Sequence, residues 1–393
     1  MIDENRIIEN LKSFSFPRLS GTDDERKAFN LAFKKLEQLK FKPLSQDFVF
    51  STFYARVYPK IALLSGFTLL LMLFLNFNTI IIPISSIFIL LLLGFLFKIT
   101  RKPERIKIGK KLNSANLYVK LDLMTKNEEV EINKINDSNR EKSVLFFCHL
   151  DSKGQRFSIL VRIRVIRAWV FSSLTIIIIT VCKNYIFVSY SLLFYIIGAF
   201  PMAINLISTI FILLNATNNK SKGAIDNASG IACVLELLNY YSNPEFRLNH
   251  FNLWFVFTGA EECGTMGIRN FCYKLEQINK KESIIFNFDA IAKNIYLFPG
   301  KKMSGNVKSI YNTFLNNNKG LEIKRNPKKI YFGSHSDGYY LKKKKFEGIG
   351  IGDMESYKYL HSIRDTVDKI DNSLLKNLCE MIIDNLIVFD NQT

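Results

Sequence analysis

Two long uncharged stretches dominate the pattern of hydrophobic and polar positions in this chain of 393 residues. Residues 61–97 carry no charge, and neither do residues 184–219. Because about 20 apolar residues already span a bilayer, each stretch is too long for a single core helix. The first stretch divides near 76–79, and the second joins the apolar run that begins at Ala168. The pattern therefore predicts four helices, at about 60–76, 80–97, 166–182 and 187–214.

We interpret these helices as two transmembrane hairpins, 58–99 and 166–216, with a turn near Lys183 and Asn184 in the second. Very apolar pairs of core helices remain the alternative. A hairpin leaves and re-enters the soluble phase on the same side of the membrane. We therefore expect residues 1–55, 105–165 and 220–393 to fold together as one catalytic domain into which the hairpins are inserted.

The remaining parts of the chain alternate between strand and helix patterns. Continuous apolar runs at 144–148, 253–257 and 284–288 are typical of strands buried on both faces, and 117–123 and 349–351 are further strand candidates. Thr22 and Glu25 form a capping-box pattern before a helix to about Leu39, Asn227 is expected to cap a helix to about Tyr241, and 373–389 is amphipathic. This alternation predicts an α/β fold, a three-layer sandwich with a mostly parallel central sheet.

The net charge of +18 is concentrated beside the hairpins. The basic residues there are Arg56, Lys60, Lys98, Arg101, Lys102, Arg105, Lys107, Lys110, Lys111, Arg156, Arg162, Arg164, Arg167, Lys220 and Lys222. Only Lys183 lies at a hairpin tip. Basic residues at one set of membrane ends predict that the catalytic domain and both termini are cytoplasmic, with the lipid bilayer as a partner. No nucleic-acid-binding motif accompanies the charge, and the basic run 342–345 is interpreted as a solvated loop.

Targeting signals and cysteine spacing add two expectations. The N-terminal segment is charged and has no apolar core, so no cleavable signal peptide is predicted. The six cysteines have neither disulfide-framework nor metal-site spacing, which favours free thiols in a reducing compartment.

Five short acidic and histidine motifs supply the candidate chemistry. They contain His149 with Asp151, Asp226, Glu261 with Glu262, Asp289, and His361. In parallel sheets, ligands bind beyond the carboxyl ends of the strands, which is where His149, Glu261 and Asp289 are expected. Imidazoles and carboxylates without paired cysteines suit zinc or a similar divalent ion, and one carboxylate remains for proton transfer.

Each motif alone has a structural alternative. His149 and Asp151 lie two positions apart on one face of an extended segment, so Asp151 can fix the imidazole tautomer, although many such pairs are purely structural. Asp226 can bridge two cations or simply cap a helix. Adjacent buried carboxylates such as Glu261 and Glu262 need a compensating cation, and they point in different directions. One can therefore bind metal while the other faces a bound water.

As an ordered set, the sequences HLD, GAIDNASG, TGAEE, NFDA and the final H-x-x-x-D resemble the co-catalytic zinc aminopeptidase family of the MH clan (metallopeptidase family twenty-eight). The segment PRLSGT at residues 17–22 is similar to that family's N-terminal entry sequence. The resemblance covers nearly the whole chain except the two hairpins, which most soluble members lack. It implies the zinc-peptidase (phosphorylase/hydrolase-like) fold, two zinc ions per chain and a peptide substrate.

By position, the resemblance implies that His149 and Asp289 hold one metal, that Glu262 and His361 hold the other, and that Asp226 bridges them. It implies that Glu261 is the general base and that Asp151 orients His149. His335 and Asp337, in GSHSDGYY, resemble the family's Ser-Asp loop near the substrate pocket.

The expected function is a membrane-anchored zinc metallopeptidase, an aminopeptidase that cleaves N-terminal peptide bonds. A carboxypeptidase, dipeptidase or other amidohydrolase could use the same metals. A catalytically silent adaptor with this fold is a further alternative, but all five ligands and the base are present. A transporter is disfavoured, because the expected spans contain no ionisable residue apart from Lys183 at a turn. Substrate preference and oligomeric state stay open.

Overall fold

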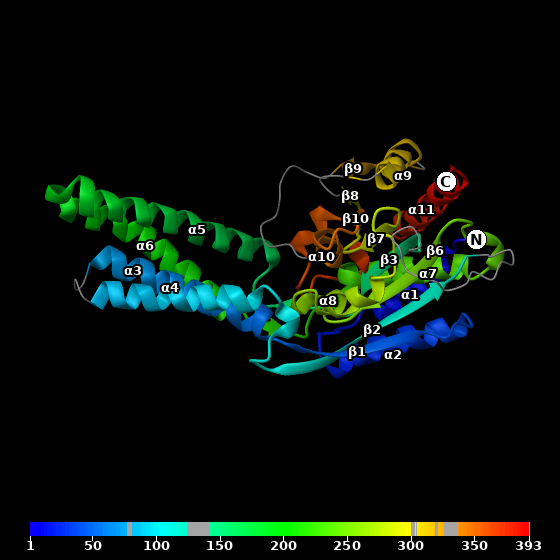
Figure 1. Ribbon diagram of the computed structural model, residues 1–393, viewed down its shortest axis with the longest axis horizontal. Coiled ribbons are helices and arrows are strands. Elements are labelled where there is room, and N and C mark those ends of the chain that lie inside the picture. The colour runs from blue at the N-terminus through cyan, green and yellow to red at the C-terminus, as the bar shows by residue number, and fades with distance from the viewer. Residues whose placement is uncertain are drawn as a thin grey trace. The chain divides into compact units, whose positions relative to one another are not determined.

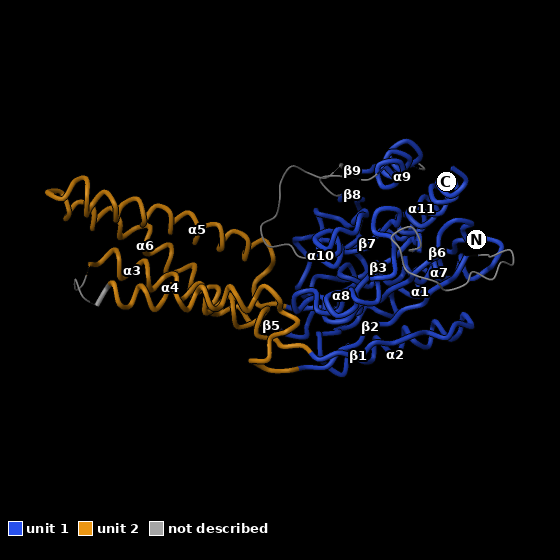
Figure 2. The backbone as a smooth tube through the Cα atoms, viewed as in Figure 1, with its two compact units in different colours: residues 1–49, 112–154, 218–393 blue, residues 50–111, 155–217 orange. Residues whose placement is uncertain are grey.

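The structure is a computed structural model, and it describes residues 1–76, 81–123, 141–299, 303, 305–318, 321–325 and 336–392. The chain forms two compact units (Figure 2). Unit 1 contains Met1–Val49, Leu112–Gly154 and Asn218–Thr393, and unit 2 contains Phe50–Lys111 and Gln155–Thr217. Unit 2 is therefore made of two segments, each of which interrupts the sequence of unit 1.

Unit 1 is built on an eight-stranded mixed sheet with the order β1-β2-β6-β3-β7-β10-β8-β9 (Figure 1). The strands are β1 (Leu44–Ser51), β2 (Lys111–Leu121), β3 (Ser143–His149), β6 (Asn252–Thr258), β7 (Ile284–Phe288), β8 (Ile295–Pro299), β9 (Ile323–Arg325) and β10 (Gly348–Gly352). The four central strands β6, β3, β7 and β10 are parallel, whereas β2 and β8 run antiparallel to their inner neighbours. The predicted α/β class with a mostly parallel sheet is confirmed.

The central strands carry large apolar side chains on both faces of the sheet. On one face, the ring of Phe146 in β3 stacks on Phe255 of β6 and Phe286 of β7, at centroid distances of 5.0 and 5.6 Å. On the other face, a second cluster contains Tyr118, Leu145, Phe147, Trp254, Val256, Ile268, Phe271, Leu275, Ile278, Ile285, Tyr340, Leu341 and Phe346. Continuous burial of the strands explains why their sequences are apolar runs rather than alternating patterns.

Helices pack on both faces of the sheet. α7 (Ser229–Tyr241) packs on β3, β6 and β7, and α1 (Glu4–Phe14) and α11 (Asn372–Gln392) pack against α7. The cluster on the opposite face includes residues of α8 (Met266–Phe271) and α10 (Asp337–Lys343). The unit also contains α2 (Asp23–Gln38) and α9 (Gly305–Asn316). As predicted, the Asn227 side chain accepts a hydrogen bond from the Gly230 N–H in the first turn of α7, at 3.2 Å.

Two local predictions in unit 1 are wrong. Helix α2 begins where expected, but Thr22 makes no capping hydrogen bond with its side chain. Glu25 accepts a hydrogen bond from the N–H of Gly21 rather than that of Thr22, and its other oxygen accepts one from Ser114. The basic run 342–345 is not simply a solvated loop. Lys342 and Lys343 belong to α10, and the half-buried Lys342 ammonium donates a hydrogen bond to the Phe298 carbonyl.

Unit 2 consists mainly of four long apolar helices that lie side by side (Figure 1). They are α3 (Tyr58–Leu75), α4 (Ile81–Thr100), α5 (Ile159–Val181) and α6 (Ser191–Leu214). All four are long and apolar enough to cross a membrane, judged by length and composition. Helix α5 begins earlier than expected, because Ser158 caps it through a hydrogen bond from the Val161 N–H. Arg162, Arg164 and Arg167 therefore lie within its first turns.

Candidate metal centre

The candidate metal centre lies at the carboxyl edge of the central strands. β3 ends at His149, β6 at Thr258 and β7 at Phe288, and these strands are parallel neighbours. Residues that directly follow the three strands therefore meet at one edge of the sheet. Asp226 reaches the same place from the irregular turn before α7, where the Asp226–Asn227 peptide bond is cis.

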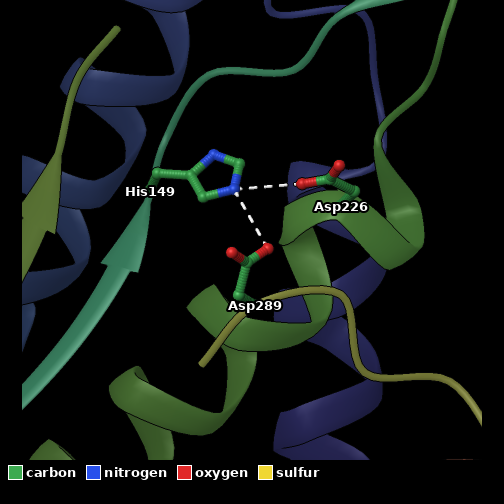
Figure 3. Close-up of side chains that lie close together, drawn as sticks. All are labelled: His149, Asp226 and Asp289. Atoms are coloured by element: carbon green, nitrogen blue, oxygen red, sulfur yellow. Dashed lines mark ion pairs between the residues drawn. The ribbon is translucent and has the colours of Figure 1, made fainter. Parts of the chain in front are cut away.

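The first group of possible ligands contains His149, Asp226 and Asp289 (Figure 3). The Nε2 atom of His149 lies 3.0 Å from Oδ1 of Asp226 and 3.7 Å from Oδ1 of Asp289. His149 and Asp226 are buried, and the Asp289 carboxylate is partly exposed. One imidazole nitrogen therefore faces two carboxylate oxygens, with room for solvent from the side of Asp289.

The second group contains Asp226, Glu262 and His361. The Nε2 atom of His361 lies 2.8 Å from Oε1 of Glu262 and 3.3 Å from Oδ2 of Asp226. Asp226 thus presents one oxygen to each group. All five sequence-predicted ligands come together, and the carboxylate predicted to bridge two cations is the residue that the two groups share.

Several buried polar atoms in this cluster make no hydrogen bond. They are Nε2 of His149, Oδ1 of Asp226 and Oε1 of Glu262. Leaving buried polar atoms without hydrogen bonds is costly, and a cluster of three acidic groups with two imidazoles is destabilised further by repulsion among the carboxylates. A divalent cation in each group would coordinate these atoms and offset the repulsion. The donor set of nitrogen and oxygen atoms therefore fits zinc.

Side chains from three other elements fix the loop that carries Glu261 and Glu262. The N–H groups of four consecutive residues, 259–262, all donate to buried side chains. Gly259 donates to Asn116 of β2 at 3.1 Å, and Ala260 donates to Glu25 of α2 at 2.8 Å. Glu261 and Glu262 donate to the two carboxylate oxygens of Asp151, both at 3.0 Å. These contacts hold the direction in which each glutamate leaves the backbone.

Asp151 acts on this loop more directly than on His149. Its carboxylate oxygen lies 3.4 Å from Nδ1 of His149, whereas its backbone oxygen lies 3.0 Å from the same nitrogen. A hydrogen bond from Nδ1–H to that carbonyl leaves Nε2 as the lone-pair nitrogen that faces Asp226. Asp151 therefore orients His149 mainly through its backbone, while its side chain positions the two glutamates.

Two buried groups that support the site are missing from the sequence prediction. Glu25 accepts hydrogen bonds from Gly21, Ala260 and Ser114, and burial, followed by the charge of Asp151, raises the pKa of Glu25 to about 8. Arg18 is fully buried and donates to the carbonyls of Leu150, which follows the possible ligand His149, and of Gly223, which precedes the possible ligand Asp226. Their sequence contexts, a helix start and the PRLSGT segment, gave no local sign of these long-range contacts.

Lys153 is a further supporting residue that the sequence prediction lacks. Its Nζ donates to Oε2 of Glu262 at 2.8 Å and to the Glu262 carbonyl at 3.2 Å. Although burial raises the pKa of Glu262, the charges of His361 and Lys153 outweigh burial and lower it to about 2. Positions 149, 151 and 153 are every second residue of one extended segment, so their side chains share a face. The spacing that pairs His149 with Asp151 could therefore have identified Lys153 as well.

Asp365 supports the turn that carries Asp226. Its carboxylate accepts hydrogen bonds from the Ile225 and Asp226 N–H groups, at 2.6 and 3.4 Å. Burial, followed by the nearby Asp226 charge, raises the pKa of Asp365 to about 7. The final H-x-x-x-D motif thus contributes a possible ligand, His361, and a residue that holds the shared carboxylate in place.

Glu261 is buried beside the ligands, but its carboxylate makes no hydrogen bond to a residue that the structure describes. Burial raises its pKa well above the usual value, although His149 acts in the opposite direction, and the charges of Glu262, Asp289 and Asp337 raise it further. Nearby cations reverse this effect by favouring the ionised form. Glu261 is therefore a carboxyl group that has no side-chain hydrogen bond among the described residues and lies next to groups that could hold cations.

Of the two residues predicted to lie near the substrate pocket, the structure describes Asp337. Asp337 is buried, accepts a hydrogen bond from the Thr258 hydroxyl through Oδ2, and makes no hydrogen bond through Oδ1. Burial raises its pKa to about 7. The His149, Asp289 and Asp151 charges also act on Asp337, so it belongs to the same electrostatic cluster. His335 lies outside the described residues.

Comparisons with known proteins agree with this architecture. Residues 205–386 match the model of Peptidase family M28, a stretch that contains Asp226, Glu261, Glu262, Asp289 and His361. No curated protein matches the sequence. The chain is thus similar to the family suggested by its motifs over the segment that carries four of the five possible ligands.

Solved structures extend the similarity to the whole fold. The aminopeptidase from Aneurinibacillus sp. strain AM-1 is 14% identical, with a TM-score of 0.55, over 98% of this chain and 93% of that one. The glutaminyl cyclase of Fimbriiglobus ruber is 13% identical, with a TM-score of 0.55, over 99% and 95%. BSAP, a zinc aminopeptidase from Bacillus subtilis, is 12% identical, with a TM-score of 0.54, over 98% and 95%. At these identities the comparison establishes an aminopeptidase-like fold.

Proposed function

We propose that the protein is a membrane-anchored zinc aminopeptidase with two metal ions per chain. The observation that carries this proposal is the position of Asp226, whose two oxygens face two different groups of ligands. A carboxylate shared in this way suits a pair of cations a few ångströms apart, the arrangement that serves hydrolysis of amide bonds.

In this proposal, His149 and Asp289 would hold one ion, Glu262 and His361 would hold the other, and Asp226 would be a ligand of both. Bound zinc ions would polarise the scissile carbonyl and lower the pKa of water. The protein's own part is to fix the ligands. Asp151, Glu25 and Asn116 accept the N–H groups of the 259–262 loop, and Lys153 binds the Glu262 oxygen that points away from His361.

Glu261 is the proposed proton carrier. Its carboxylate takes a proton from the attacking water and then gives it to the nitrogen of the leaving amine, which departs neutral. Two features support this role. The carboxylate has no hydrogen bond to a described residue, and the Asp151 carboxylate holds the Glu261 backbone in place.

A free N-terminal amine is the proposed recognition element of the substrate. Asp337, a buried carboxyl group that is not a proposed ligand, belongs to the same electrostatic cluster. Acidic groups favour a cationic ammonium over the carboxylate of a C-terminus. Two of the similar structures are aminopeptidases, and a third is a glutaminyl cyclase. Cyclisation of an N-terminal glutaminyl residue is therefore the second candidate reaction, and carboxypeptidase or dipeptidase activity is less favoured.

The chemical proposal is tested with the full chain purified in detergent beside Glu261→Gln. Zinc content is measured together with hydrolysis of peptide amides that carry free or blocked N-termini, and a glutaminyl peptide tests cyclisation. About two zinc ions per chain, activity on free amines only and loss of activity in the variant would support the aminopeptidase. Zinc without hydrolysis of any peptide would move the assignment to another amide substrate. A protein that binds no zinc would point to a catalytically silent adaptor.

We further propose that unit 2 is the membrane anchor, with the catalytic unit and both termini in the cytoplasm. The four apolar helices and their basic ends support this arrangement. A compartment-sensitive reporter inserted after Asn76 should report the opposite side of the membrane from a reporter fused after Gln392. The same side for both reporters would contradict the hairpin topology and favour apolar core helices.

A further inference from the structure

Unit 2 carries most of the net charge of the protein. Its two segments, 50–111 and 155–217, contain fourteen lysines and arginines and a single acidic residue, Glu104, which gives +13 of the total +18. Unit 1, which is the larger unit, therefore carries +5. Unit 2 is both the most apolar and the most basic part of the molecule. The need to position the proposed catalytic residues, which lie in unit 1, does not explain this concentration of positive charge in unit 2.

Contacts within unit 2 bring the basic ends of its helices together. The Lys60 ammonium at the start of α3 donates to the Leu213 carbonyl at the end of α6, at 2.8 Å. The start of α5 meets the end of α6 through the rings of Phe157 and Phe211, at 5.1 Å. A cluster around Phe53, Leu96 and Ile106 joins the start of α3 to the end of α4. One end of the bundle therefore collects all the basic residues of unit 2 except Lys183.

The opposite end of the bundle has a different character. Lys183 is buried there, with its ammonium 3.8 Å from the Tyr195 ring centroid, and it donates a hydrogen bond to the Phe74 carbonyl. This lysine caps the end of α3 internally. The basic side chains of unit 2 that a partner could contact therefore lie at the first end of the bundle.

Ten basic residues at that end are exposed, and we name this set the basic collar. It consists of Lys98, Arg101, Lys102, Arg105, Lys107, Lys110, Lys111, Arg156, Arg164 and Arg167. Exposed apolar side chains lie among them in the sequence, such as Phe97 and Ile108. A surface that mixes basic and apolar groups suits the interface between headgroups and acyl chains.

We propose that the basic collar binds the headgroups of anionic phospholipids, in the leaflet where α3 and α5 begin and α4 and α6 end. The proposal rests on the proposed membrane insertion of unit 2 and is independent of the peptidase chemistry. The positive N-terminal ends of α3 and α5 lie in the same region and add to the attraction for phosphate. Anionic lipid would thereby fix the depth of the bundle in the bilayer.

The apolar surface beside the collar favours lipid over other polyanions. Helices α5 and α6 expose large apolar side chains along their length, including Phe171, Ile178, Phe200 and Ile207. A nucleic acid or an acidic protein could neutralise the collar but would leave this apolar surface in water. A phospholipid supplies a phosphate at the level of the collar and acyl chains along the helices.

Trp169 is a natural probe for the test. It lies in α5 two residues after Arg167, and the other tryptophan of the chain, Trp254, is buried in the sheet of unit 1. The full chain is reconstituted into vesicles of phosphatidylcholine with a minor fraction of phosphatidylglycerol. Either lipid carries bromine on its acyl chains, and quenching of tryptophan fluorescence reports which lipid lies beside α5.

We expect brominated phosphatidylglycerol to quench at least about twofold more than brominated phosphatidylcholine at equal mole fraction, and the excess to fall at high salt. Glutamine at Arg156, Arg164 and Arg167 should remove the excess. The matched control has glutamine at Lys34, Lys42 and Lys281, three exposed lysines of unit 1, and should keep it. A second variant, with glutamine at Lys98, Arg101 and Lys102, tests the collar at the end of α4.

The outcomes separate the proposals. Equal quenching by both lipids in the unmodified protein would overturn the collar proposal and leave membrane insertion standing. An excess that persists in both collar variants would overturn it as well. Absence of quenching by either lipid would refute insertion itself. If a DNA duplex or an acidic peptide abolished the excess, the collar would be assigned to a macromolecular polyanion instead.

Discussion

The two units bury polar groups in opposite ways. In unit 1, the buried cluster at the strand ends is charged, and Nε2 of His149, Oδ1 of Asp226 and Oε1 of Glu262 make no hydrogen bond. In unit 2, the buried cluster around Asn205 is neutral, and most of its polar groups bond to one another. The Asn205 amide donates to the hydroxyls of Ser172 and Ser173, at 2.9 and 2.8 Å, and both hydroxyls donate to the Trp169 carbonyl.

This difference separates a binding site from a packing contact. Neutral groups that bond to one another stabilise the contact between α5 and α6 and need nothing from outside. Carboxylates and imidazoles that face one another at 2.8–3.3 Å are stabilised either by protonation of the imidazoles or by a cation that joins them. The comparison predicts that changes in the first cluster affect metal binding and catalysis, while changes in the second affect only the stability of the bundle.

The largest effect is expected for Asp226→Asn. The neutral amide removes the charge that both ligand groups share, so both ions should be lost together. Hydrolysis should fall by more than about three orders of magnitude, since several kcal/mol of charge stabilisation disappear. Zinc content by mass spectrometry and steady-state kinetics measure both effects. Asp47→Asn, at an exposed position of unit 1, is the control. Retention of one full zinc ion by Asp226→Asn would contradict a shared ligand.

Substitutions of the two adjacent glutamates should affect catalysis and metal binding separately. Glu261→Gln should lower kcat by about 10²–10⁴-fold and leave the zinc content unchanged, because the amide cannot accept a proton but Glu261 is not a proposed ligand. Glu262→Gln should instead lose the zinc ion held with His361. Both variants keep the backbone N–H groups that bond to Asp151. A loss of zinc in Glu261→Gln would mean that Glu261 is the metal ligand and Glu262 the general base.

Lys153→Met should weaken zinc binding at the Glu262 half of the site by about 10–100-fold, the usual effect of removing a residue that orients a metal ligand. The methionine keeps the length of the side chain but removes the charge that binds Oε2 of Glu262. Competition with a chelator measures the affinity without reference to activity. Lys153→Arg should restore most of it. Equal affinities in the methionine variant and the unmodified protein would show that Glu262 needs no such partner.

In unit 1, the sequence predicted features that depend on local patterns but not those that depend on long-range contacts. Residues that end an apolar run, such as His149 and Asp289, were predictable because parallel strands bring their ends to one edge. Glu25 was assigned to a local capping box, yet its side chain bonds to Ala260, more than two hundred positions away. Local patterns describe helices and strand ends, but they contain nothing about which distant backbone group a buried carboxylate will meet.

The helices of unit 2 were predictable from composition, although their ends were less so. Helix α5 extends back to Ile159, because Ser158 caps it and because arginines are tolerated in a helix end that faces headgroups or water. The polar cluster around Asn205 was not predicted at all. Asn205 is a single amide side chain within a long run without charged residues, and only the packing of α5 against α6 brings Ser172 and Ser173 to it.

The smallest effect is expected for Asn205→Leu, which tests the second half of the comparison. The leucine removes the amide from the cluster but leaves the hydrogen bonds of both serines to the Trp169 carbonyl. Hydrogen bonds between membrane helices contribute about 0.6 kcal/mol each on average, so the bundle should lose no more than about 2 kcal/mol. Unfolding of the reconstituted protein measures this loss. Leu206→Ala, at the neighbouring exposed position, is the control for loss of packing.

Zinc content and kcat should be the same in Asn205→Leu as in the unmodified protein, because the neutral cluster holds only helices. A change in either quantity would mean that the cluster in unit 2 influences the metal centre, and the distinction drawn between the two buried clusters would then be wrong. A loss of stability far above 2 kcal/mol with unchanged zinc would keep the distinction. It would then assign to the Oδ1 atom of Asn205, which makes no hydrogen bond in the structure, a partner that strengthens the cluster, such as a buried water.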